Sequence, residues 1–106
     1  MAVQLTNNAF SLIPLGVQST DTSLTVTTGD GAKFPVLGAS EFFYLTLVNT
    51  SGPFEIVKVT ARVDDVMTIE RGQIGTVALT FLPNSRAELR VTVENVFIAA
   101  GDYLLL

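Results

Sequence analysis

Apolar and polar side chains alternate along two neighbouring segments in the middle of the chain. In the first segment, residues 54–62, one face consists of Val57, Val59 and Ala61 and the other of Lys58, Thr60 and Arg62. The second segment, residues 66–70, places Met67 and Ile69 opposite Val66, Thr68 and Glu70. A repeat of two residues is that of a β-strand, whose successive side chains point to opposite faces. Because only Val63-Asp64-Asp65 separates the segments, they predict a β-hairpin.

Two further segments alternate in the same way. Residues 23–27 place Leu24 and Val26 on one face. Residues 86–93 place four apolar side chains inward and four polar ones outward, namely Ala87, Leu89, Val91 and Val93 against Arg86, Glu88, Arg90 and Thr92. Turn-forming residues at 29–31, 49–53 and 82–85 separate these strands. If residues 86–93 pair with the hairpin, their charged face aligns with Lys58, Arg62 and Glu70. The resulting cross-strand charge pairs would help to fix the register of the strands more than they would stabilise the sheet.

Residues 41–48 are apolar on both faces of the predicted strand. One face carries Phe42, Tyr44 and Val48, and the other carries Phe43, Leu45 and Leu47. A strand of this kind is covered on both sides. It is therefore either a central strand of a sandwich or a strand coated by another chain.

The two ends of the chain are apolar without a regular repeat. Residues 1–18 are interrupted by Ile13-Pro14-Leu15-Gly16 and are interpreted as an arm that lies over the core or over a neighbouring subunit. Residues 95–106 end in Tyr103, Leu104, Leu105 and Leu106, which pack on the domain itself or on a partner. The expected organisation is thus an N-terminal arm (1–18), a β domain (19–94) and an apolar C-terminal tail (95–106).

Composition supports a β fold in a single domain. The chain has 106 residues, of which 31 are valine, isoleucine or threonine. β-branched side chains suit a pleated surface and lose rotamer freedom in helices. We therefore expect an all-β protein, a small antiparallel β-sandwich or barrel with apolar N- and C-terminal arms.

Charge and residue content exclude several classes of function. Six basic and ten acidic residues give a net charge of −4, which argues against binding to a nucleic-acid backbone. The chain lacks histidine and cysteine, so the commonest general base and thiolate metal ligands are missing. It has no run of 18 or more apolar residues, and residues 1–10 have neither a basic region nor a long apolar region, so neither a membrane span nor a secretory signal is expected. We expect no enzyme activity, no cofactor and no membrane contact.

Two short motifs resemble catalytic or ligand-binding elements but have simpler explanations. Asp64-Asp65 could form a carboxylate pair, but adjacent residues of a turn point in different directions and rarely converge on one ion. The pair is therefore interpreted as a solvated hairpin turn. Gly29-Asp30-Gly31-Ala32-Lys33 lacks the spacing of a phosphate-binding loop, and turn geometry explains its glycines.

The element Arg71-Gly72-Gln73-Ile74-Gly75-Thr76 has two interpretations. Its glycines allow positive φ or the close approach of another chain. Arg71 offers five donors, and Gln73 is able to bridge two chains. The element is either a tight loop in which Arg71 pairs with Glu70 or another carboxylate, or an intersubunit or tail-docking contact.

The hairpin and this element together resemble a β domain of bacteriophage tail proteins, found at the N-terminus of tail fibres. There, an "EIVKVTAR" strand is likewise followed by a turn, a strand and an "RGQ-x-GT" element. The similarity extends to residues 27–35, 42–48 and 85–90, and so covers roughly residues 20–93.

The resemblance implies a virion structural protein, made in the bacterial cytoplasm and located in the tail. It would act as a tail or tail-fibre attachment component, bind other virion proteins and form a homo-oligomer such as a trimer. Arg71, Gln73, Tyr103, Leu104, Leu105 and Leu106 are the expected partner-binding residues. The given sequence stops at Leu106, where a tail fibre would continue into a shaft, so it is expected to be either a short stand-alone protein or a piece of a fibre. The first of these interpretations implies an adaptor role. The alternative is a capsid decoration protein. A carbohydrate-binding or hydrolytic domain ranks last because tryptophan is missing.

Overall fold

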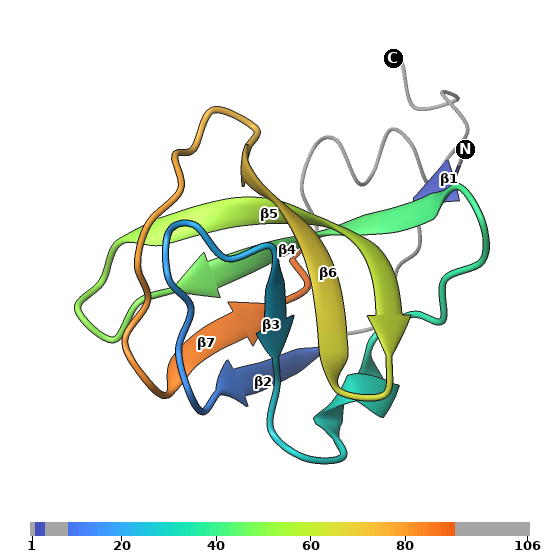
Figure 1. Cartoon of the computed structure of the whole chain (residues 1–106), viewed down its shortest axis with the longest axis horizontal. Helices are drawn as coiled ribbons and strands as arrows, with labels where there is room; N and C mark the ends of the chain where they lie inside the picture. The colour runs from blue at the N-terminus through green and yellow to red at the C-terminus, as the bar shows by residue number, and fades with distance from the viewer. Residues whose placement is uncertain (1, 4–8, 91–106) are drawn as a thin grey trace.

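Seven strands and one short 3₁₀ helix make up the regular structure of residues 2–3 and 9–90, the part of the chain that the computed structural model describes (Figure 1). In chain order they are β1 (Ala2–Val3), β2 (Phe10–Ile13), β3 (Ser23–Thr25), η1 (Asp30–Lys33), β4 (Glu41–Val48), β5 (Phe54–Val63), β6 (Val66–Gln73) and β7 (Ser85–Glu88). The strands fall where alternation or two-faced apolar runs predict them, except for β1 and β2.

Six strands form one antiparallel sheet in the order β2-β7-β4-β5-β6-β3, and β1 pairs in parallel with β4 outside this path. The two ends of the sheet approach each other. The N–H of Thr27, just after β3, donates to the C=O of Leu12 in β2 at 3.1 Å. The sheet therefore curls into a nearly closed barrel (Figure 1). This confirms the all-β prediction, and of the two predicted architectures, sandwich and barrel, the protein has the barrel.

The interior of the barrel is filled by apolar side chains from its strands and from the segments between them. Its fully buried members include Ile13, Phe34, Phe43, Leu45, Leu47, Val57, Val59, Met67, Ile69, Phe81 and Ala87. The rings of Phe34 and Phe43 stack with centroids 6.1 Å apart and an interplanar angle of 11°. Such burial contributes about 1.5–3 kcal/mol for each large apolar side chain. The predictions that Val57 shares a face with Val59 and Met67 a face with Ile69 are confirmed, since all four side chains are buried in the interior.

Strand β4 is buried on both of its faces, as its sequence predicts. It lies between β5 and β7, so it is a central strand of the barrel sheet. On the face away from the interior, Phe42 is only 4 % exposed. Its ring meets Tyr44 edge-on with centroids 5.5 Å apart, and the Nζ of Lys58 lies 4.5 Å from its centroid. Lys58 of β5 therefore helps to cover this outer face.

Strands β5 and β6 form the predicted hairpin around a two-residue turn. Val63 pairs with Val66 across Asp64-Asp65, and Asp64 has a φ of 54°. The prediction that Ala61 shares a face with Val59 is wrong, because Ala61 is exposed. The register shifts between these two residues, so one extra residue enters β5 and the alternation is interrupted.

The condition under which the charged face of residues 86–93 would align with the hairpin, namely direct pairing of the two, is not met, because β7 pairs with β2 and β4. The hairpin has no free edge, since β4 pairs with β5 and β3 pairs with β6. Ala87 and Leu89 point inward as predicted. Residues 91–93, which complete the predicted strand, lie outside the described residues.

The segment expected to be an arm, residues 1–18, enters the barrel well before its predicted end. Residues 10–13 form β2, and Val17 pairs with Phe81 in an isolated bridge. Gly16 makes the turn between them with a φ of +70°. A Cβ there would lie 2.3 Å from the Phe81 carbonyl oxygen, so only glycine fits. The expected tail, residues 95–106, lies outside the described residues.

Candidate functional site

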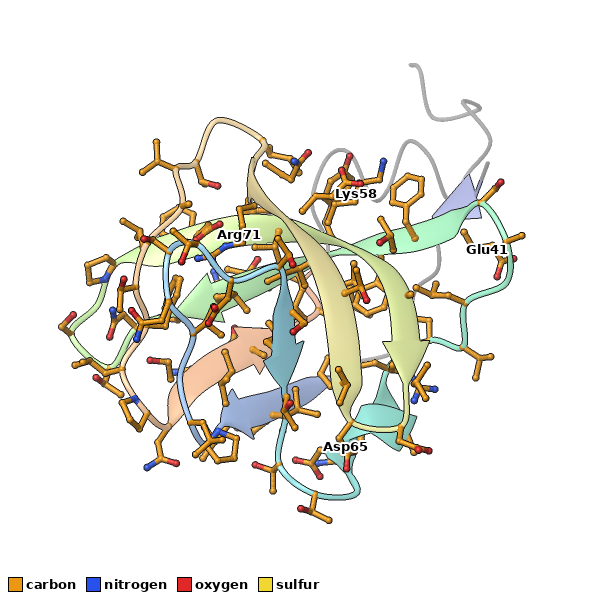
Figure 2. The ribbon with its side chains drawn as sticks, in the orientation of Figure 1. Glu41, Lys58, Asp65 and Arg71 are labelled. Atoms are coloured by element: carbon orange, nitrogen blue, oxygen red, sulfur yellow. The ribbon has the colours of Figure 1, made fainter. Side chains whose placement is uncertain are left out.

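The inward faces of β5 and β6 each carry one charged residue at the same end of the barrel. On β5 the inward positions Val57 and Val59 are preceded by Glu55, and on β6 Met67 and Ile69 are followed by Arg71. A strand directs every second side chain to the same face. The hairpin therefore brings a carboxylate and a guanidinium together, and Figure 2 labels Arg71 at this position.

Glu55 and Arg71 form a two-bonded ion pair. The Nε of Arg71 donates to Oε2 of Glu55 at 2.9 Å, and its Nη2 donates to Oε1 at 2.8 Å. Glu55 is 0 % exposed, and the Arg71 side chain is 10 % exposed. Paired geometry of this kind is characteristic of arginine, whose planar fork matches a carboxylate.

The other N–H groups of Arg71 are used within the same chain. Its Nη1 donates to the carbonyl oxygens of Gln18 and Asp21, the latter at 3.0 Å, and its Nη2 also donates to the carbonyl of Leu79. With the two bonds to Glu55, all five guanidinium N–H groups have an acceptor. Arg71 thereby joins strand β6 to the β2–β3 connection and to the segment after β6.

The carboxylate of Glu55 is equally saturated. Its Oε2 accepts the backbone N–H of Gly72 and its Oε1 accepts that of Leu79, each at 2.8 Å. Burial by itself would raise the pKa of Glu55. The hydrogen bonds from Arg71, Leu79 and Gly72, together with the charge of Arg71, outweigh burial and lower the pKa below its usual value. Glu55 is thus held ionised with its acceptor positions filled, and it serves as a structural anchor.

These contacts bear on both interpretations of the Arg71 element. Arg71 does pair with a carboxylate, but the partner is Glu55 rather than Glu70. Gln73 is half-buried, and its Nε2 donates to the backbone carbonyl of Arg71 at 3.1 Å. A role for Arg71 and Gln73 in binding a partner stays a prediction. Tyr103, Leu104, Leu105 and Leu106 lie outside the described residues.

A tight turn follows the ion pair. The N–H of Thr76 donates to the C=O of Gln73 at 3.0 Å, and the two residues between them have φ values of 51° (Ile74) and 77° (Gly75). The Oγ1 of Thr76 accepts the N–H of Ile56 at 3.0 Å, which fastens the turn to β5. The predicted positive φ is therefore present at Gly72 and Gly75, and it extends to Ile74.

The hairpin turn at the opposite end of β5 and β6 is more than a solvated turn. The Asp65 carboxylate accepts the N–H groups of Gly29 and Gly31 at 3.1 and 2.8 Å. Turn geometry alone does not explain Gly31, since a Cβ there would lie 2.0 Å from the Asp64 carbonyl oxygen. Among residues 2–3 and 9–90, no group of three or more acidic side chains is arranged to hold a metal ion.

The loop that contains Gly29 and Gly31 is also tied to β2. The Oγ of Ser11 donates to Oδ2 of Asp30 at 2.8 Å, and the Nζ of Lys33 lies 3.2 Å from Oδ1. The hydrogen bond from Ser11, aided by Lys33, lowers the pKa of Asp30 against the opposing effect of burial. These contacts involve both charged side chains of the loop, Asp30 and Lys33, and they explain the loop as part of the scaffold.

A shallow, open hollow of about 150 Å³ lies on the outer face of β4 and β5. Its lining consists of Ser40, Glu41, Phe42, Lys58 and Thr60, of which Figure 2 labels Glu41 and Lys58. Lys58 contacts the Phe42 ring, and Glu41 accepts the N–H of Gly38. The hollow is too open to exclude water from a reaction.

Glu55 is the residue that reasoning from the sequence missed. It lies in the same register as Val57 and Val59, so alternation places it inward. A glutamate in an inward register requires a partner, because an unpaired buried charge is very costly. Arg71 has the same register on β6, and the two positions together would have predicted the ion pair.

Comparison with protein-family models and with curated proteins finds no match to this chain. Within its described residues, the chain contains no helix long and apolar enough to cross a membrane.

Proposed function

We propose that this chain is a structural protein of a phage virion, a tail or tail-fibre attachment component that acts through protein–protein contacts. The resemblance of residues 54–76 to tail-fibre attachment domains motivates the proposal. In this role the barrel is a rigid body placed between larger components, and its loops and termini make the contacts. Receptor binding and catalysis belong to other proteins of the particle.

The observation that supports the proposal most directly is how the Arg71 element uses its charges. Arg71 and Glu55 satisfy each other and five backbone groups within the chain, so they have no hydrogen-bonding capacity left for a substrate. No charged residue follows Arg71 until Arg86. The ion pair thus fixes a segment, residues 72–85, that carries no charged side chain, and such a segment suits protein contact better than chemistry.

Exposed apolar side chains at both ends of the barrel also support a role in assembly. Leu15 is 87 % exposed, Val36 80 %, Val63 71 % and Val77 68 %. Single exposed apolar residues are ordinary, but several on loops of one small domain suit a protein that is surrounded by partners.

Immunogold electron microscopy tests the proposal. Antibody raised against the purified chain is applied to particles released from the bacterium that carries this sequence. Gold at the tail is the expected result. Gold spread over the capsid would overturn the tail assignment in favour of a decoration protein. Particles without gold, from cells that contain the protein, would refute a virion role.

A further inference from the structure

We draw no further inference here: the strongest candidate, the exposed apolar surface of Leu15 and Leu82 where the turn after β2 lies against the segment before β7, carries none because nothing in the structure shows what covers it.

Discussion

Removal of the Arg71 guanidinium should destabilise the barrel far more than removal of an exposed arginine. Arg71→Ala leaves the charge of Glu55 in a fully buried site and takes away two of its four hydrogen bonds. The carbonyl groups of Gln18, Asp21 and Leu79 lose donors at the same time. Segments from three parts of the chain are loosened by the one change.

The expected magnitude follows from the burial of the pair. Removing one partner of a buried ion pair costs about 3–5 kcal/mol, because the remaining charge is left uncompensated. The free energy of unfolding of a small domain is only about 5–15 kcal/mol. Since each kcal/mol lowers the melting temperature of a domain of this size by about 4 °C or more, the expected fall is at least about 12 °C.

Thermal and urea unfolding followed by circular dichroism measure this effect, with Arg86→Ala as the matched control. The Arg86 side chain is 55 % exposed and pairs with Glu88 at the surface, so its loss should cost less than about 1 kcal/mol. Equal stability of the two variants would refute the reasoning. A Glu55→Ala/Arg71→Ala double variant should lose less than the sum of the single variants, because the two residues act as one unit.

Three further predictions concern acid stability, packing and assembly. The pKa of Glu55 is lowered in the folded chain, so the stability that its ionised carboxylate contributes is complete above the ordinary glutamate pKa of about 4.3 and is lost as pH falls through the folded pKa. In a plot of the urea midpoint against pH, Glu55→Gln should therefore fall less steeply at acid pH than the unchanged chain. An equally steep fall would contradict this. Gly31→Ala should lower the urea midpoint strongly because its Cβ would meet the Asp64 carbonyl, whereas Gly29→Ala, which has open space but positive φ, should cost only about 1 kcal/mol; the reverse order would contradict the contact. Deletion of Tyr103–Leu106 should weaken assembly measured by light scattering while the circular dichroism of the barrel is retained, and unchanged assembly would remove the tail from the partner-binding residues.

Local patterns predicted much of the barrel wall. The hairpin, its turn and the inward positions Val57, Met67 and Ile69 follow from alternation, because burying one face of a strand requires every second residue to be apolar. The same rule failed at Ala61, where a shift in register inserts an extra residue into β5. A shift of this kind depends on the curvature of the barrel and leaves no mark in the local sequence.

The choice between barrel and sandwich, and the partners of β2 and β7, required the tertiary structure. Residues 10–13 have too short and irregular a pattern to be recognised as a strand, yet pairing with β7 buries Ile13 completely. Pairing between distant strands is decided by which edges are free and by the closure of the sheet. Neither is a property of one segment.

The sequence by itself determined most of the inward positions along the strands, that the protein is built of strands, and that a glycine-containing turn follows Arg71. Only the tertiary structure decided what Arg71 does. Its partner, Glu55, is sixteen residues away, and its carbonyl acceptors on Gln18, Asp21 and Leu79 belong to segments that meet only when the barrel closes. A charged side chain becomes an anchor or a binding group according to the dielectric and the hydrogen-bonding groups around it, and these are fixed by the fold as a whole.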